Sequence, residues 1–221
     1  MKKNWWKIAG VFLILFSIIA GLLIPVPDLP IVHQSIRNLF FHVGMWFAML
    51  VIFTISFIYS ICYLSDFKTD NDIVAQEASK VGVFFGILGI ATGMIWAKFT
   101  WGSWWVNDPK LNGAAVSLLV YFAYLALRNS LNEEQKRAKV SAVYNIFAYV
   151  LLIVFIGILP RLAQGSIHPG DTSNPLTIGA LDNNLRLVFY PAVVGWILLA
   201  VWILELKVKI CKLERKINSY D

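Results

Sequence analysis

The residues of this chain best suited to chemistry are its three histidines and a dense run of tryptophans. The histidines are His33, His42 and His168, and the run lies in the stretch WGSWWVNDPKL at residues 101–111. Imidazole is the commonest side-chain ligand for metal ions, and indole offers a large, flat apolar face. Three tryptophans within five residues, between two long apolar segments, raise the question of what they bind.

The composition predicts an all-α integral membrane protein. Of its 221 residues 58% are hydrophobic and 14% charged, and the mean hydropathy is +0.68, whereas soluble domains carry about 25% charged residues. Apolar runs of about 17–25 residues can cross a bilayer as helices. They predict a bundle of about six transmembrane helices, at residues 5–24, 41–64, 81–97, 112–127, 141–159 and 185–206. We expect residues 1–221 to form one transmembrane domain, because no connection is long enough for a second.

The distribution of Lys and Arg predicts the orientation of these six spans. The ends of the chain, with the second and fourth connections, carry 14 of the 19 Lys and Arg residues. Positive charge is enriched on the cytoplasmic side, so we expect both termini to be cytoplasmic. The net charge of +6 is then a topology signal and an attraction to lipid headgroups, with no need for a nucleic-acid partner. All three histidines and the tryptophan run would lie at the outer side.

The tryptophan run predicts an aromatic platform at the outer surface. If Trp101 opens a short interfacial helix in the third connection, then Trp101, Trp104, Trp105 and Asp108 share one face by their spacing. Asp108 followed by Pro109 reads as an N-cap and first helical residue of the fourth span. A generic aromatic belt would also place indole at the headgroups, but such a belt spreads over many helix ends. Crowding in one connection favours a binding platform for a planar apolar ligand.

His42 and His168 are more informative as a pair than singly. Alone, each is as easily a hydrogen-bonded residue at the interface or in a loop. Together they flank the platform, with one imidazole before it and one after it on the same side of the membrane, as the two axial ligands of a haem iron would require. His33 is a poorer ligand, since nine residues from His42 on one helix it would point about 180° away.

The outer connections also hold the cations that haem propionates would need, and we cannot rank them from the sequence: Arg37, Lys98, Lys110, Arg161 and Arg186. Sulfur chemistry is not expected, because Cys62 and Cys211 are too far apart for a CxxC pair. The sequence has no nucleotide-binding Walker motif, so any ATP would be used by another protein.

At these residues the chain resembles the haem-handling cytochrome c assembly family, whose hallmark is a tryptophan-rich "WWD" segment. The stretch at 101–111 matches the family pattern at Trp101, Gly102, Trp105, Asp108, Pro109 and Leu111. The resemblance extends over the whole chain, and by length and number of spans it is closest to the haem exporter protein C (CcmC) branch. The family's flanking histidines correspond to His42, in HVGMWFAM, and to His168, in LAQGSIHPG.

The resemblance implies a non-enzymatic protein of the bacterial inner membrane that binds haem b non-covalently at its periplasmic face. His42 and His168 would ligate the iron, and Trp101, Gly102, Trp104, Trp105 and Asp108 would form the platform. The implied partners are ABC-type exporter subunits (CcmA- and CcmB-like), a small CcmD-like subunit, and a periplasmic haem chaperone (CcmE-like) that receives the haem for c-type cytochrome biogenesis.

Three departures from the family pattern affect the site. Asn107 stands where a tryptophan is usual, Lys110 where arginine is usual, and Gly44 where a proline often occurs. Lysine lacks the planar fork that binds a carboxylate with two hydrogen bonds. Two other functions stay open from the sequence: a membrane b-type cytochrome subunit, which typically holds haem deep within its helices, and a haem-free integral subunit.

Overall fold

The computed structural model describes residues 4–27, 32–163, 166–168 and 181–218, and within them it confirms six helices long and apolar enough to cross a membrane. The first is α1 (Trp5–Leu23) and the second is α2 (Leu39–Asp66), which the 3₁₀ helix η1 (His33–Asn38) precedes. The third and fourth are α3 (Thr69–Trp101) and α4 (Pro109–Asn129). The fifth joins α5 (Glu134–Leu152), the π-helix η2 (Ile153–Ile158) and α6 (Leu159–Leu162), and the sixth is α7 (Asn183–Asn218).

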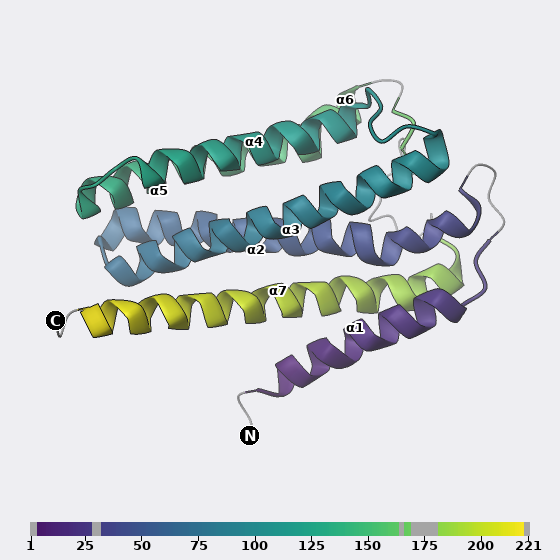
Figure 1. Ribbon diagram of the computed structural model, residues 1–221, viewed down its shortest axis with the longest axis horizontal. Coiled ribbons are helices and arrows are strands. Elements are labelled where there is room, and N and C mark those ends of the chain that lie inside the picture. The colour runs from purple at the N-terminus through teal and green to yellow at the C-terminus, as the bar shows by residue number, and fades with distance from the viewer. Residues whose placement is uncertain (1–3, 28–31, 164–165, 169–180, 219–221) are drawn as a thin grey trace.

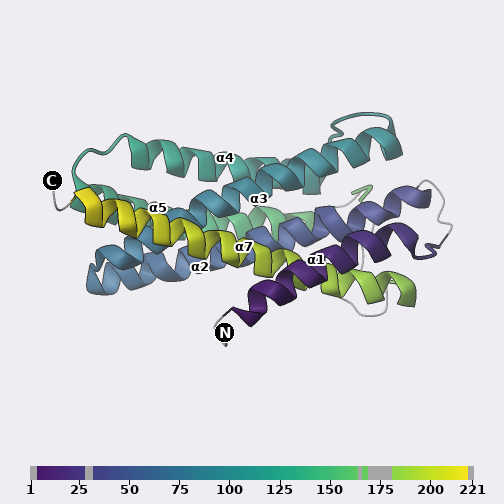
Figure 2. The same cartoon turned by 60° about the horizontal axis from the view of Figure 1, so that its bottom comes forward.

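The helices run up and down in three layers (Figure 1). α4 and α5 form one layer, α2 and α3 the middle one, and α1 and α7 the third, with α1 packed mainly on α7. In Figure 2, turned so that the bottom of Figure 1 comes forward, α1 and α7 lie in front of the other helices. One end of the bundle gathers η1, α6, the end of α3 and the start of α4, and we call it the site end. The turns from α2 to α3 and from α4 to α5 lie at the opposite end.

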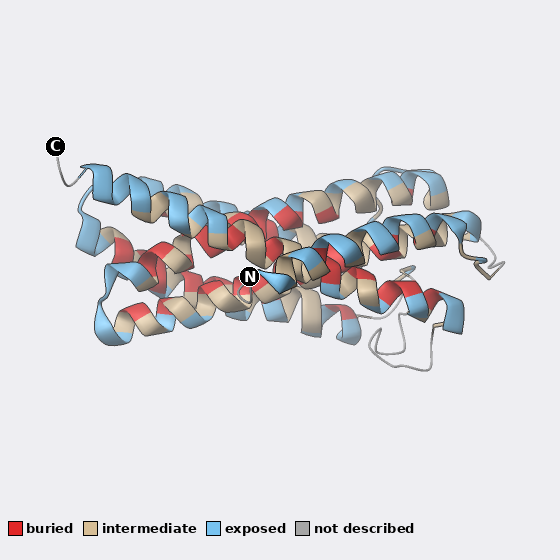
Figure 3. Cartoon of the chain, turned by 90° about the horizontal axis from the view of Figure 1, so that it is seen from below, coloured by how far each residue is buried: buried red, intermediate tan, exposed pale blue. Residues whose placement is uncertain are grey.

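Buried residues lie mainly on the helix faces that point into the bundle, and exposed residues lie on the outward faces and at the ends (Figure 3). The main core lies where α2 contacts α3 and α4, with Phe53 stacked on Tyr121 at an interplanar angle of 19°. Large apolar side chains of α1 such as Ile8 and Phe12 are exposed. Because lipid tails are as apolar as these side chains, such a surface is expected for a helix at the edge of a transmembrane bundle.

Glycines of α3 let α2 approach closely. The sequence places Gly82, Gly86, Gly89 and Gly93 at small-xxx-small spacing, which permits close helix contact. Phe53 lies over Gly82, Trp46 over Gly89 and His42 over Gly93, where a Cβ would stand 2.7 Å from the histidine Cε1. The spacing therefore serves packing within this chain, and it sets the position of His42.

A buried ion pair joins α3 to α4 at the opposite end. Arg128 donates to both carboxylate oxygens of Asp72, at 2.8 and 2.6 Å, and also to Oε1 of Gln76 at 2.9 Å. Removing one partner of such a pair strands a buried charge and costs about 3–5 kcal/mol. This ion pair therefore holds α3 and α4 together at the end of the bundle opposite the site end.

Candidate functional site

Asp108 begins α4 as the sequence predicts. Its side chain accepts a hydrogen bond from the Lys110 backbone N–H at 2.8 Å, and Pro109 occupies the first turn of the helix. An N-cap carboxylate satisfies backbone donors that have no partner within the helix. The WWD segment is thereby joined directly to the fourth span.

The predicted short interfacial helix within the WWD segment is wrong. Trp101 is the last residue of α3, which runs past the predicted boundary at residue 97, and residues 102–108 have no helical structure. The reason is Gly102, whose φ of 76° is a left-handed conformation that ends helices. Trp104 and Trp105, with 52% and 38% of their surfaces exposed, therefore belong to an irregular loop.

His168 lies in a corner formed by two indoles. Its ring centroid is 5.1 Å from that of Trp101 and 5.9 Å from that of Trp96, and the two indoles meet edge to face at 4.9 Å. Both tryptophans are on the last turns of α3. The structure thus brings together a predicted platform residue, Trp101, and a predicted ligand, His168, from distant parts of the sequence.

Asp108 is the link that holds His168 there. Its carboxylate is 1% exposed, and Oδ2 accepts from the Ser166 hydroxyl and the Ile167 N–H, both at 2.9 Å. The other oxygen, Oδ1, is 3.4 Å from Nδ1 of His168. Burial raises the pKa of Asp108, but the hydrogen bonds from Ser166, Lys110 and Ile167 outweigh burial and hold the pKa below its usual value.

The separation of 3.4 Å between Asp108 and Nδ1 of His168 does not meet hydrogen-bond geometry, so the carboxylate can act on the tautomer of His168 only through its charge. An ionised carboxylate has no proton to donate, so its charge favours the imidazole with its proton on Nδ1. The lone pair is then on Nε2. A carboxylate behind a histidine in this way is the arrangement that orients metal-binding imidazoles.

His42 is oriented by Thr92 in an analogous way. Nδ1 of His42 is 3.1 Å from the Thr92 hydroxyl, which lies 2.8 Å from the Leu88 carbonyl and donates to it. With its hydrogen engaged there, the hydroxyl accepts from His42, which places the imidazole proton on Nδ1. His42 also meets Trp46 edge to face, at 6.2 Å between centroids.

The two histidines approach the same face of α3. His42 contacts Thr92 and Gly93, and His168 contacts Trp96, one helical turn further along. His33, the third histidine, is exposed at the start of η1 with a φ of 42°.

Thr92, Gly93, Trp96 and Ser166 belong to this site, although sequence reasoning did not select them as site residues. Trp96 is held in place by a hydrogen bond from its Nε1 to the Ser35 hydroxyl at 3.1 Å. Its spacing of three and four residues from Gly93 and Thr92 could have shown the shared face.

The five candidate cations differ in their contacts. Backbone carbonyl oxygens accept from Arg37 (Gly21, 2.6 Å), Lys98 (Gly102, 2.9 Å) and Arg161 (Gly157). The backbone N–H of Lys110 donates to the N-cap carboxylate of Asp108. Within the described residues, the buried Nε of Arg186 has no hydrogen-bond partner. Arg186 is therefore the one of the five cations whose buried Nε is left without a hydrogen bond by the described residues.

Asn107, at a position where the family usually has tryptophan, takes part in the structure of the loop. Its Oδ1 accepts from Nδ2 of Asn112 at 2.7 Å, and Oδ1 of Asn112 accepts from Nε1 of Trp105 at 3.3 Å. The amide pair connects the loop to the first turn of α4. At this position the chain thus has a hydrogen-bonded amide side chain in place of an aromatic ring.

Comparison with known proteins gives consistent matches. The family model described as heme exporter protein C matches residues 2–220. A heme exporter protein C of Paracoccus denitrificans is 22% identical over 175 residues, which are 79% of this chain and 72% of that protein. A cytochrome c biogenesis protein CcsA of Prochlorococcus marinus is 39% identical over 87 residues, 39% of this chain. That match spans only 27% of the CcsA protein's length.

Proposed function

The chain belongs to the haem exporter protein C family, and from this membership we propose that it binds haem at the site end of the bundle and delivers it for c-type cytochrome biogenesis. Haem is then its cargo. The proposal assigns no catalytic residue to the chain. Its chemistry is to hold, orient and release a haem.

The observation that supports this proposal best is that His42 and His168 pack against the same face of α3, at Thr92 and Gly93 and at Trp96. Each imidazole has an oxygen atom near Nδ1, at 3.1 Å for His42 and 3.4 Å for His168. Neutral imidazole binds metal through its unprotonated nitrogen, so Nε2 of each would ligate the haem iron. Two such ligands from separate elements suit a molecule that is held and later released.

The aromatic residues would supply the apolar surface of the site. Trp96 and Trp101 form the corner around His168, and the exposed indoles of Trp104 and Trp105 with Gly102 form the loop beside it. Indole presents a flat face to a porphyrin. Asp108 would act through His168 and the loop, without contact to the macrocycle.

Binding would be non-covalent, with haem b as the ligand. Thioether attachment of haem, as in c-type cytochromes, uses cysteine sulfur, and the chain has two cysteines, Cys62 and Cys211. Both are on the halves of α2 and α7 remote from the site end. For the propionates we propose Arg186 first, then Lys110, Arg37, Lys98 and Arg161.

The proposed setting is the bacterial inner membrane, with the site end in the periplasm. ATP hydrolysis would come from an ABC-type exporter with CcmA- and CcmB-like subunits, assisted by a small CcmD-like subunit. A CcmE-like periplasmic chaperone would receive the haem. The exposed position of Trp104 and Trp105 leaves the platform accessible to such an acceptor.

Absorption spectroscopy of the purified chain tests the proposal. We expect a haem Soret band that falls strongly in His42→Ala and in His168→Ala and stays in His33→Ala, the matched control. Haem should then move to an added periplasmic chaperone. Full haem occupancy in the double variant His42→Ala/His168→Ala would refute the ligand assignment, and haem that is never transferred would favour an electron-transfer subunit.

A further inference from the structure

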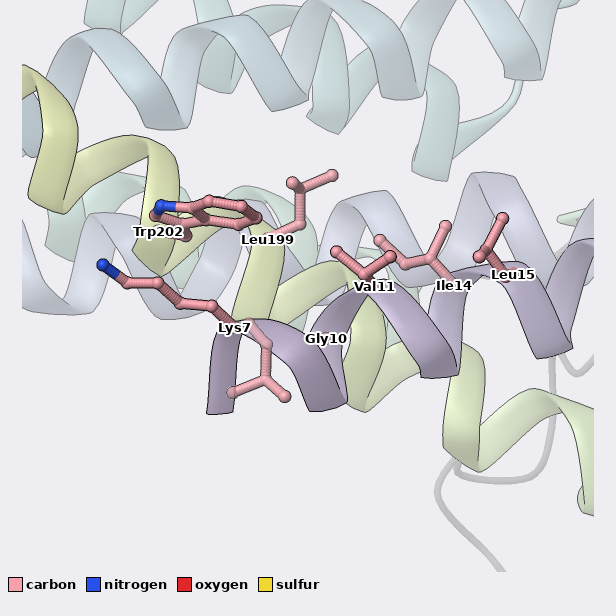
Figure 4. A pocket seen from close by; sticks show the side chains of 8 residues that line it. Lys7, Gly10, Val11, Ile14, Leu15, Leu199 and Trp202 are labelled. Carbon is pink, nitrogen blue, oxygen red and sulfur yellow. The ribbon is translucent and has the colours of Figure 1, made fainter. Parts of the chain in front are cut away.

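A narrow apolar groove of about 180 Å³ separates part of α1 from α7, far from the haem site (Figure 4). Its walls are Lys7, Gly10, Val11, Ile14, Leu15, Leu198, Leu199 and Trp202. At Gly10 the helices are in tight contact, since a Cβ there would be 3.1 Å from Cβ of Leu198. Beside this contact the larger side chains diverge and leave the groove.

The surroundings of the groove are lipid. Both α1 and α7 are long and apolar enough to span a membrane, and the neighbouring residues Ile8 and Phe12 of α1 are 73% and 67% exposed. A whole helix, about 10 Å across with its side chains, is too thick to enter this space. A single acyl chain is of the right width and polarity.

One end of the groove is marked by a cationic cluster. Nζ of Lys7 is 2.9 Å from Oε2 of Glu205, and Lys209 pairs with the other oxygen of the same carboxylate. Two ammonium groups therefore share one carboxylate, which leaves a net charge of +1. Lys7 also lies 5.3 and 5.7 Å from the ring centroids of Trp6 and Trp202.

We propose that this groove binds an anionic phospholipid, with one acyl chain along Val11 and Leu15 and the phosphate at the Lys7–Lys209 pair. Tryptophan favours the headgroup level of a bilayer, so Trp6 and Trp202 place the cationic cluster where a phosphate lies. Basic pockets between transmembrane helices bind anionic headgroups by this combination of charge and apolar contact. The lipid fills the space between α1 and α7 and strengthens the packing of α1 on α7.

Quenching by brominated lipids tests this site in the purified full chain. The probe is phosphatidylglycerol with brominated acyl chains, compared with phosphatidylcholine carrying the same chains. The fluorescence difference between the wild type and Trp202→Phe isolates the signal of Trp202. We expect this signal to be quenched saturably, at about fivefold lower phosphatidylglycerol than phosphatidylcholine, because one cation near a membrane surface contributes about 1 kcal/mol.

Variants separate the charge from the groove. Lys7→Gln should remove the preference for phosphatidylglycerol, and Glu205→Gln should increase it. Val11→Phe should fill the groove and abolish saturable quenching, whereas Ile8→Phe, on the same helix but outside the groove, should not. Equal quenching by both lipids in the wild type, or unchanged saturation in Val11→Phe, would overturn the proposal. Haem binding enters none of these readouts, so the result is independent of the proposed function.

Discussion

At the scale of single residues, the site depends on two oxygen acceptors as much as on the two histidines. Thr92 and Asp108 each face an Nδ1 atom, at 3.1 and 3.4 Å. Neither would touch a haem in the proposed mode. In that mode they favour the proton on Nδ1 of each imidazole, and a histidine in the other tautomer presents N–H instead of a lone pair to the metal.

Thr92→Val should weaken haem binding because valine keeps the shape of threonine but accepts no hydrogen bond. Loss of a residue that orients a metal ligand costs about 10–100-fold in affinity, and we expect a loss in this range. Haem titration followed at the Soret band measures it. Thr92→Ser, which restores the hydroxyl, should recover most of the affinity. An unchanged affinity in Thr92→Val would show that Thr92 does not orient His42.

The pH dependence of the loop follows from the depressed pKa of Asp108. A carboxylate with a pKa lowered by folding stabilises the folded state above its ordinary pKa, and this contribution is lost as the pH falls through the lowered value. The ordinary value is 3.8, so Asp108 should stay ionised at pH 5. After correction for intrinsic rates, the Ile167 amide should exchange its hydrogen equally slowly at pH 7 and pH 5. It should exchange faster in Asp108→Ala, and a wild-type protection that disappears at pH 5 would contradict this assignment.

At the scale of elements, hydropathy predicts the six spans, because bilayer thickness sets both length and composition. The cap at Asp108–Pro109 is also predictable, since it depends on local chemistry. The end of α3 at Trp101 could not be predicted from the sequence. Lys98 interrupts the apolar run, but its side chain donates to the Gly102 carbonyl while the helix continues to Trp101. That continuation puts Trp101 on α3, where it meets Trp96 and His168, so sequence reasoning missed this contact.

The π-helix η2 also could not be predicted from the sequence, and it makes a close contact with another helix. Gly113 of α4 faces the carbonyl oxygen of Phe155 in η2 so closely that a Cβ would collide with it. A π-turn widens the helix locally and leaves backbone groups displaced. The contact of backbone with backbone brings the first turns of α4, and hence Asp108, against the segment that leads to His168.

Gly113→Ala should therefore destabilise the protein, because a backbone carbonyl cannot rotate away as a side chain can. Overpacking of this kind costs about 1–3 kcal/mol. Gly157→Ala is the matched control in η2 itself, where a Cβ would meet its nearest atom at 3.7 Å, an ordinary contact. Thermal unfolding in detergent should show a lower Tm for Gly113→Ala and a small change for Gly157→Ala. Equal Tm values would mean that the contact is not tight in the membrane protein.

At the scale of the whole molecule, most of the charge lies at one end of the bundle, and the two histidines with the tryptophan loop lie at the other. The opposite end carries the ion pairs Arg128–Asp72, Lys212–Asp70 and Arg215–Glu134, together with most of the Lys and Arg residues. The site end carries His42, His168 and the tryptophan loop. This polarity would let one charge distribution set both the insertion of the chain and the side on which haem is presented.

Cysteine labelling tests that orientation directly. In a background with Cys62→Ser and Cys211→Ser, we would introduce Ser103→Cys in the tryptophan loop and Gln135→Cys at the start of α5, both at exposed positions. Because positive charge is retained in the cytoplasm, a maleimide that cannot cross membranes should label position 103 in intact spheroplasts and position 135 only after lysis. The same reagent on inverted vesicles should give the reverse pattern. Labelling of position 135 in intact cells would place the haem site in the cytoplasm, where no periplasmic acceptor could reach it, and the proposed direction of delivery would then fail whatever the affinity of His42 and His168 for haem.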